Sequence, residues 1–337
     1  GISLLIFIGM IFVLFCMVLI MPSEEYETVN YDIPNMRDYY THIKGNGEDK
    51  VTLMVYMVGS DLESDGGAAS EDIAEMTAAN ADNITLQTGG AAAWENASIS
   101  DGKTERHIIK NGELQNVANL GETQMTSPNT LTDFIKWSAS NYPADRYELV
   151  HWNHGGGTAL GFGYDEMYPD DMLSLSQIGN ALSDSGIKFD IVGFDACLMG
   201  TIETAYMLEP YADYLVASEE YEPGTGWYYS EWLKNLSDNT SMPTVEIGKK
   251  IVEDYINGPD SSFFDSNTLS IVDLREIPYT YSKLCETMQQ EEGVLDSRYS
   301  VISQARYNAK SFGDGEYEQI DIKSYLEECG KSDTELG

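Results

Sequence analysis

The sequence predicts an α/β fold, with a mostly parallel sheet of about six strands and helices packed on both of its faces. Short apolar runs rich in Val, Ile and Leu alternate along the chain with stretches of helical length and pattern. The runs are continuous rather than alternately apolar and polar, which is typical of strands buried on both faces. With 42% hydrophobic residues among 337, the chain can bury such a sheet.

The first predicted elements have clear local signals. The apolar run at residues 51–59 ends at a glycine and predicts the first strand. Residues 69–79 have a helical pattern, with Ser70 as the capping residue. Residues 83–90 form a second short apolar run that ends in two glycines, and they predict the second strand.

A hairpin and further strand–helix pairs follow. Residues 106–120 predict a hairpin, because Asn111-Gly112 is a preferred two-residue turn. The remaining helices are predicted at residues 127–143, 173–186, 197–211 and 245–257. The remaining strands are predicted at residues 147–157, where the strand runs into glycines, and at 191–196, 213–220 and 268–274. This alternation is the basis for expecting parallel strands.

The N-terminal segment differs from the rest of the chain. Residues 1–21 contain no charged side chain and match the roughly 20 apolar residues that a helix needs to cross a bilayer. They predict a transmembrane anchor rather than a cleaved signal, because no small-residue cleavage site follows. Residues 22–49 are polar and predict a stalk, and residues 50–337 predict one folded domain. The last thirty residues do not complete the pattern, which suggests that the domain is truncated there.

The charge balance limits the possible functions. The chain has 19 Lys and Arg against 56 Asp and Glu, a formal net charge of -37. Such a surface repels phosphate backbones, so nucleic-acid binding is not expected. It suits basic substrates, divalent cations or an exported protein. Together with the predicted anchor, it indicates an extracytoplasmic domain held at the cell membrane, or a secreted one if the anchor is removed.

The four cysteines form neither a disulfide framework nor a zinc-binding pattern. Cys16 lies in the predicted anchor. Cys285 and Cys329 are expected to be buried small side chains. No metal site is predicted from Cys and His spacing. Cys197 differs from the others because it directly follows a predicted core strand.

Two predicted strands end in reactive side chains. His151 and His154 close the third strand before three glycines, and Asp195 and Cys197 close the fourth. Functional groups in an open α/β sheet gather beyond the carboxyl ends of the strands, so neighbouring strands would bring His154 and Cys197 together. Periodicity does not choose between the two histidines. We favour His154 because it directly precedes the glycines, and we expect His151 to pack or to orient its neighbours.

This pair of residues suits nucleophilic catalysis. The thiolate is the attacking form of a cysteine, and an imidazole favours it, as would a helix that begins at or just after Cys197. The imidazole of His154 can then protonate a departing amine. The backbone N–H groups of Gly155 and Cys197 are the predicted donors to an oxyanion.

The motifs HWNHGGG at 151–157 and GFDACLMG at 193–200 resemble those of the clostripain family of cysteine peptidases. That family shares the caspase-like fold with caspases, gingipains, legumain and separase. VTLMVYMVGSDLE at 51–63 and DYLVASEEYEPGTGW at 213–227 extend the resemblance, and ARYNAKSFG at 305–313 continues it more weakly. The resemblance implies a caspase-like three-layer sandwich.

Matched residue by residue, the resemblance implies that His154 is the general base, Cys197 the nucleophile and Gly155 an oxyanion glycine. Asp195 matches an acidic residue near the mouth of the family's specificity pocket. Family members cleave after Arg or Lys, and a guanidinium in a pocket needs a charged partner.

A second pocket carboxylate is expected from the loop after the fifth strand. Glu219, Glu220 and Glu222 are the candidates, and the sequence does not choose among them. Trp227, in the same loop, either walls the pocket or covers the edge of the sheet.

Activation and metal dependence vary within the family. Some members are cleaved at a basic residue between the histidine and the cysteine, but here no Lys or Arg lies between Gly155 and Ile187, so self-cleavage there is not expected. Some members require calcium. An acidic loop offers oxygen ligands without the ordered positions of a calcium-binding hand. Its carboxylates are Asp165, Glu166, Asp170 and Asp171. No cofactor is required by the pattern, and calcium stays open.

Four other polar residues are expected to have no role in catalysis. His42 and His107 lie in polar stretches and are expected at the surface. Asp61 and Glu63 follow the first strand at its functional end, where we expect them to cap the next turn.

The sequence therefore predicts a membrane-anchored or exported cysteine endopeptidase. It would hydrolyse peptide bonds after Arg or Lys through an acyl-enzyme on Cys197, with His154 as acid and base. The predicted partners are protein or peptide substrates and, through the N-terminal segment, the membrane. The alternative is a catalytically silent module of the same fold that binds basic peptides or cell-surface partners in an acidic groove.

Overall fold

The computed structural model describes residues 40–258, 267–292, 295–313 and 319–335. The predicted anchor at 1–21 and most of the predicted stalk lie outside these residues. The compact unit that contains the sheet begins at Tyr40. None of the helices in the described ranges is both long enough and apolar enough to cross a bilayer.

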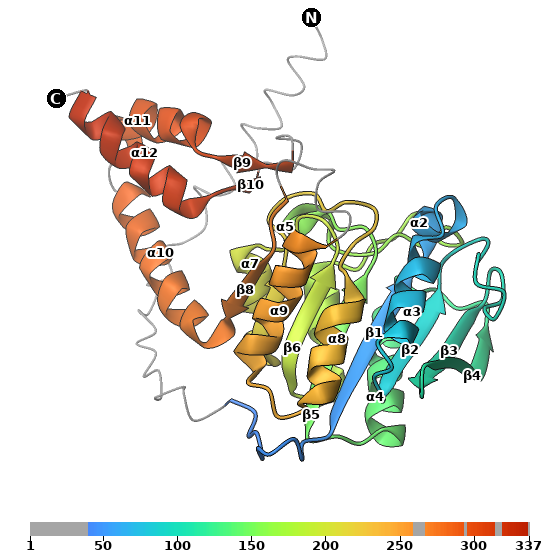
Figure 1. The fold of residues 1–337 in the computed structure, drawn as a ribbon. Helices are drawn as coiled ribbons and strands as arrows, with labels where there is room; N and C mark the ends of the chain where they lie inside the picture. The colour runs from blue at the N-terminus through green and yellow to red at the C-terminus, as the bar shows by residue number, and fades with distance from the viewer. Residues whose placement is uncertain (1–39, 259–266, 293–294, 314–318, 336–337) are drawn as a thin grey trace, which may run out of the picture. The chain divides into compact units, whose positions relative to one another are not determined.

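In the described residues, eight strands form one sheet in the order β4-β3-β2-β1-β5-β6-β7-β8 (Figure 1). Their bounds are β1 Val51–Val58, β2 Ile84–Gly89, β3 Thr104–Lys110, β4 Glu113–Gly121, β5 Arg146–Trp152, β6 Phe189–Asp195, β7 Ala212–Ala217 and β8 Ser270–Asp273. The five strands from β2 to β7 in this order are parallel, which confirms a mostly parallel sheet. β3, β4 and β8 pair antiparallel.

The prediction of about six strands was too low because the predicted hairpin joins the sheet. β3 pairs with β2, and β4 pairs with β3 at the edge. The turn itself is confirmed: Asn111 and Gly112 both have positive φ angles, 53° and 71°, as a type I′ turn requires.

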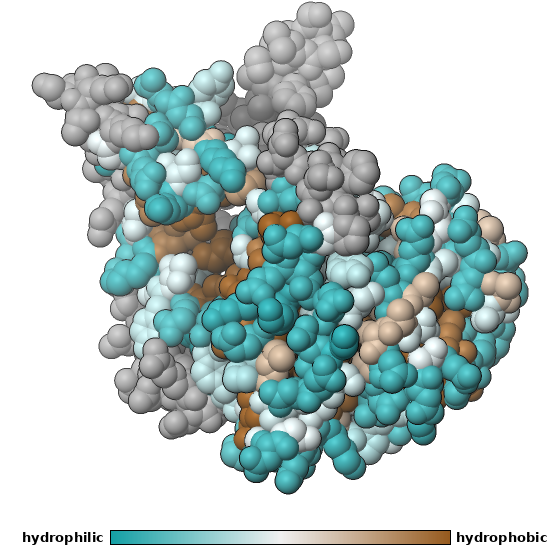
Figure 2. Space-filling model, viewed as in Figure 1, coloured by the Kyte–Doolittle hydropathy of each residue, from teal (hydrophilic) through white to brown (hydrophobic). Residues whose placement is uncertain are grey.

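Helices cover both faces of the sheet and complete the predicted three layers. One face carries α3 (Ala68–Ala78), α8 (Tyr229–Asp238) and α9 (Thr244–Asn257), whose apolar sides share a core with β1 and β2. The other carries α4 (Pro128–Asn141), α6 (Leu175–Ser185) and α7 (Ile202–Leu208). Figure 2 shows that the outer surface over α3, α8 and α9 is mostly hydrophilic, as expected for amphipathic helices on a buried sheet.

The C-terminal part of the described chain adds four helices and a two-stranded sheet. These are the 3-10 helix η3 (Leu274–Glu276), α10 (Ile277–Glu292), α11 (Leu295–Asn308), β9 (Ser311–Phe312), β10 (Gln319–Ile320) and α12 (Ile322–Glu335). Cys329 is buried in a small core with Ala305, Ala309 and Tyr325, which confirms its predicted packing role. Cys285 on α10 is half-buried.

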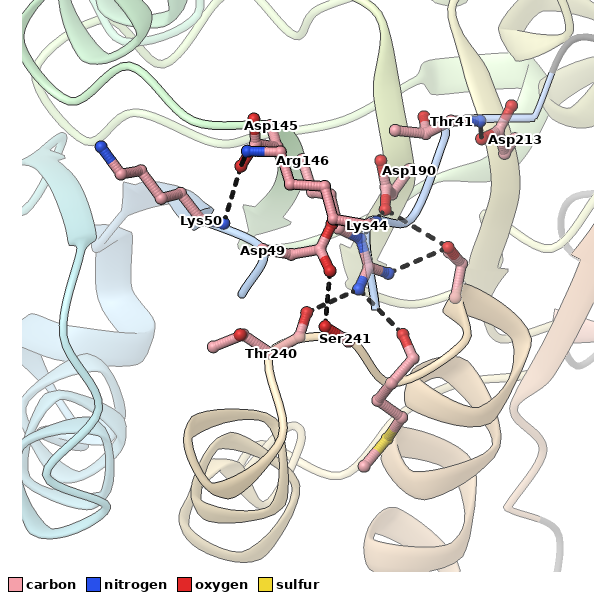
Figure 3. Close-up of polar contacts among 12 residues, drawn as sticks. Thr41, Lys44, Asp49, Lys50, Asp145, Arg146, Asp190, Asp213, Thr240 and Ser241 are labelled. Carbon is pink, nitrogen blue, oxygen red and sulfur yellow. Dashed lines mark hydrogen bonds and ion pairs between the residues drawn. The ribbon is translucent and has the colours of Figure 1, made fainter. Parts of the chain in front are cut away.

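A buried arginine ties the amino ends of the central strands to the helix layer. The guanidinium of Arg146 on β5 donates to Asp190 on β6 at 2.5 Å and to the Thr244 hydroxyl at 3.0 Å. It also donates to the backbone carbonyls of Thr240 and Met242, at 2.9 and 2.8 Å. Figure 3 shows these contacts converging on one side chain. Because all three nitrogens of this buried guanidinium donate to nearby groups, they tie the strands to the helix layer at this end of the sheet.

Residues 40–49, the last ten of the predicted stalk, lie against this same end. The backbone N–H of Thr41 donates to Asp213, at 2.8 Å, and Lys44 pairs with Asp145 at 2.6 Å (Figure 3). The chain therefore packs on the domain before β1 begins. The reactive residues of the sequence lie at the opposite, carboxyl end of the strands.

Candidate active site

The two reactive strand ends are adjacent. β5 and β6 pair in parallel with Trp152 opposite Asp195, and the N–H of Asn153 donates to the Asp195 carbonyl at 3.2 Å. A Cβ atom on Gly155 would lie 2.1 Å from the carbonyl oxygen of Cys197. The two loops therefore touch through their backbones, which confirms the predicted neighbourhood of the strands and explains why only glycine fits there.

His154 has an unexpected carboxylate partner. Its Nε2 lies 2.8 Å from Oδ1 of Asp61, at the start of α2 (Ser60–Ser64). Burial alone would raise the pKa of Asp61, but the hydrogen bond and charge of His154 outweigh it and hold that pKa below its usual value. The expectation that Asp61 caps the next turn was therefore wrong. The available signal was its position, shortly after the carboxyl end of the first predicted strand.

The other three histidines differ from His154 in their surroundings. His151 is fully buried, stacks on the Phe194 ring at 4.6 Å between centroids, and has a pKa lowered to about 4 by burial. It packs, as expected. His42 is exposed, as expected. His107 was predicted at the surface but is fully buried on β3, 3.1 Å from the Thr88 hydroxyl, because the hairpin joins the sheet.

Glu63 does act as the predicted cap, although for the following helix. Its carboxylate accepts the N–H and the hydroxyl of Ser70, at 2.8 and 2.5 Å, near the start of α3. It also accepts the N–H of Glu95 at 2.8 Å.

Cys197 lies under the loop that follows β7. Its Sγ accepts the backbone N–H of Glu222 at 3.3 Å. Burial raises the pKa of the thiol, against the lowering effect of that N–H. In the described residues no hydrogen bond joins Cys197 to His154. Catalytic contacts often tighten only when substrate binds.

The helix predicted to begin at or just after Cys197 begins later. α7 starts at Ile202 and is capped by Thr201, whose hydroxyl accepts the N–H of Thr204. Between them, Leu198 adopts φ 65°, a left-handed conformation that is costly for leucine. The Leu198 N–H donates to the Glu220 carbonyl at 3.1 Å. The Leu198 carbonyl accepts the side-chain amide of Gln319, on β10, at 3.2 Å. A turn held on both sides, rather than a helix terminus, therefore presents the sulfur.

Three buried carboxyl groups interact with one another around the end of β6. Asp195 accepts the Trp227 N–H at 3.1 Å and the Tyr229 hydroxyl at 2.8 Å, and burial raises its pKa to about 6. Asp72, on α3, accepts the Trp152 indole N–H at 2.6 Å. Burial and the charge of Asp195 raise its pKa well above the usual range.

Glu222 is the third of these carboxyl groups. Both of its carboxyl oxygens are buried, and the side chain lies against the Asp195 carboxyl group and the Trp227 side chain. Burial, followed by the charge of Asp195, raises its pKa well above the usual range. No ion pair of the described chain reaches Asp72, Asp195 or Glu222. Without a cation, burial favours the neutral forms of these carboxyl groups, and a bound cation would favour their ionised forms.

The structure places the other pocket candidates differently. Glu219 accepts the Ser270 hydroxyl at 2.6 Å, and Glu220 accepts the N–H groups of Tyr221 and Gly313, at 2.9 and 3.0 Å. The Glu219 carboxylate is thus held at the start of β8, and that of Glu220 is held within its own loop and by the residue that follows β9. Trp227 is 1% exposed and packs against β6, where a Cβ on Gly193 would lie 2.6 Å from its ring.

The acidic loop does not present a ligand set for calcium. Oδ2 of Asp165 accepts the Met125 N–H at 2.8 Å, and Glu166 accepts the Ala92 N–H at 2.7 Å. Within the described ranges, three or more metal-ligating side chains do not come together for an ion. Asp165 and Glu166 instead accept hydrogen bonds from backbone N–H groups.

Comparison with known proteins identifies the family of this chain. The model of the clostripain family matches residues 55–332. Clostripain from Hathewaya histolytica is 30% identical over 224 residues, 55% of this chain and 42% of that protein, so the match spans less than half the length of this relative.

Two solved structures share the fold. A secreted C11 cysteine protease from Bacteroides thetaiotaomicron, in complex with an irreversible peptide inhibitor, superposes with a TM-score of 0.55 at 19% identity, covering 85% of this chain and 83% of that one. An inactive zymogen C11 protease from Parabacteroides distasonis gives 0.52 at 18% identity, covering 84% and 80%. Together with the extent of the family match, these findings show that the chain belongs to the clostripain family of cysteine peptidases.

Proposed function

We propose that this protein is a cysteine endopeptidase that cleaves peptide bonds after Arg or Lys, with Cys197 as nucleophile and His154 as acid and base. The observation that carries the proposal is the cluster of buried carboxyl groups of Asp195 and Glu222 beside the thiol, which lacks a cation. A substrate guanidinium or ammonium would supply that cation. Arg fits better than Lys because its planar fork can bond two carboxylates at once.

The proposed reaction follows from the strand ends. His154 takes the proton of the Cys197 thiol, and the thiolate adds to the scissile carbonyl carbon. The backbone N–H groups of Gly155 and Cys197, in adjacent loops, are the proposed donors to the oxyanion. The tetrahedral intermediate collapses, and His154 delivers the proton to the leaving amine, which leaves an acyl-enzyme. Water, deprotonated by His154, then hydrolyses the thioester and restores the thiol.

The loop that contains Glu222 has to move away from Sγ of Cys197 for this reaction. In the free protein the Glu222 N–H donates a hydrogen bond to Sγ of Cys197, and the Glu222 carboxyl is buried close by. A basic side chain that enters the site would pair with the Glu222 carboxyl, and this pairing would move the loop away from the Cys197 thiol. Substrate binding and exposure of the nucleophile would then be one event.

We also infer an extracytoplasmic location. The predicted anchor at 1–21, the net charge of -37 and the secreted nature of the Bacteroides thetaiotaomicron relative support it. Protease accessibility of the domain in intact cells tests this location.

The function is tested with fluorogenic peptides that differ only at the residue before the scissile bond. We expect hydrolysis after Arg and Lys but not after Glu or Leu. Cys197→Ala and His154→Ala should each lose at least about 1,000-fold in kcat/KM. Cys285→Ala is the matched control and should keep full activity. Hydrolysis that survives in Cys197→Ala would exclude this mechanism, and a parent protein that binds basic peptides without cleaving them would favour the silent module.

A further inference from the structure

We propose that Asp61 is a positioning residue that fixes the ring of His154 and determines which of its nitrogens acts on Cys197. The inference rests on the proposed function, because it assumes that His154 is the catalytic histidine. It adds a third member to the Cys–His pair, from a different strand end. The contact that carries it is the 2.8 Å separation of Asp61 Oδ1 and His154 Nε2.

The backbone before Asp61 fixes the direction of the Asp61 side chain. Ser60, the residue before it, is fully buried and adopts φ 52° in the left-handed region. A non-glycine residue pays about 1 kcal/mol or more for that conformation, and such strain persists only where the surroundings enforce it. The strained residue sits at the junction of β1 and α2, so it sets the direction in which the Asp61 side chain leaves the sheet.

Asn153 enforces this junction from the histidine's own loop. Its amide donates to the Ser60 hydroxyl at 2.8 Å and to the Val58 carbonyl. Its Oδ1 accepts the N–H of Tyr164. Asn153 directly precedes His154, so one buried side chain joins the exit of β1 to the exit of β5. The side chains of Asp61 and His154 are partly exposed, 46% and 39%, but the backbone segments that carry them are joined by one buried network.

The contact assigns a tautomer to the imidazole. An ionised carboxylate only accepts, so Nε2 must carry the hydrogen in the contact with Asp61. In the neutral ring Nδ1 is then the unprotonated nitrogen. Nδ1 takes the proton of the Cys197 thiol and later gives it to the leaving amine. Asp61 keeps its hydrogen bond throughout and stabilises the imidazolium that forms between these two steps.

The other groups around His154 do not compete for this role. The Tyr164 ring packs edge to face with the imidazole, with the two ring centroids 6.3 Å apart. Glu166, the next carboxylate near α2, is already bonded to the Ser64 hydroxyl and the Ala92 N–H, at 2.8 and 2.7 Å. Cys197 lies just after the end of β6 and is not a carboxylate. Asp61 is thus the carboxylate that contacts the ring within the described residues.

The test compares Asp61→Asn with Asp65→Asn, which removes an exposed carboxylate from the end of the same helix. We expect Asp61→Asn to lower kcat by about 10- to 1,000-fold with little change in KM for an Arg substrate, because the ring is misoriented rather than the substrate unbound. Asp65→Asn should change kcat less than twofold. Asp61→Glu, which keeps the charge, should recover part of the loss.

Two readouts need no substrate and separate this inference from the proposed specificity. ¹⁵N NMR of His154 at high pH should show the Nε2–H tautomer in the parent and a mixture of both in Asp61→Asn. The acid limb of Cys197 alkylation by iodoacetamide should move to higher pH in Asp61→Asn, because the imidazolium that accompanies the thiolate is less stable. An unchanged tautomer and an unchanged alkylation profile, or equal changes in Asp65→Asn, would overturn the inference even if Arg peptides are cleaved.

Discussion

The hydroxyl of Tyr229 donates a hydrogen bond to Oδ2 of Asp195 at 2.8 Å. The contact joins the first residue of α8 to the last residue of β6, so the helix layer steadies the carboxylate beside the candidate nucleophile. This hydrogen bond favours the ionised form of Asp195, and burial opposes it with the larger effect. The balance between them determines the pH at which the pocket becomes anionic.

Replacing Tyr229 with Phe should therefore shift the pH dependence of activity. Without the hydroxyl, the pKa of Asp195 rises further above about 6, and less of it is ionised at a given pH. We expect the acid limb of kcat/KM for an Arg substrate to move up by about one pH unit. Tyr56→Phe is the matched control, since it removes a buried hydroxyl bonded to the Met125 carbonyl on the other face of the sheet. An equal shift in Tyr56→Phe would contradict this reading.

Glu222→Gln should reduce selectivity for basic substrates. The variant keeps the size of the side chain but removes the carboxyl group that could ionise against a bound Arg side chain, so we expect kcat/KM for Arg peptides to fall about 10- to 100-fold. Glu219→Gln, whose carboxylate is held by Ser270, should fall less than threefold. Kinetics with matched Arg peptides measure both variants. A larger loss in Glu219→Gln would return the choice to the alternative that the sequence left open.

Gly155→Ala should inactivate the protein without unfolding it. The new Cβ would lie 2.1 Å from the Cys197 carbonyl, and separating the two loops would displace the proposed oxyanion donors. We expect at least about a 100-fold loss in kcat, with far-UV circular dichroism unchanged. Gly330→Ala, where a Cβ meets nothing within 4 Å, is the control and should be active. Full activity in Gly155→Ala would remove Gly155 from the site.

Glu148→Gln should stabilise the protein at alkaline pH. Burial raises the pKa of Glu148 on β5 to about 7. The contribution of Glu148 to the free energy of unfolding is therefore complete at a pH below the usual carboxyl pKa. It is lost as the pH rises through the folded-state pKa of about 7. Urea unfolding should show that the variant loses about 2 kcal/mol less free energy of unfolding than the parent between pH 5.5 and 8.5. Glu113→Gln, exposed on β4, should follow the parent. A variant that follows the parent over this range would argue against an ionising Glu148.

Much of the fold could be predicted from local pattern. The continuous apolar runs at β1, β5 and β6 indicated buried strands because a strand covered on both faces has no polar side. The turn at Asn111-Gly112 was predictable because few residue pairs adopt its positive φ angles. The pairing of the hairpin with β2 could not be predicted, because strand partners leave no local signal in the sequence. The burial of His107 depends on this pairing and could not be predicted either.

By itself, the sequence determined the order of strands and helices, the reactive residues at the ends of two strands and the acidic character of the loop after β7. Only the tertiary structure decided that β1 lies beside β5, so that Asp61 reaches His154, and that Glu222 rather than Glu219 turns toward Asp195. The reason is physical. Hydrophobic periodicity encodes which side of an element is buried, whereas the direction of a loop side chain depends on backbone turns and contacts made by residues far apart in the chain.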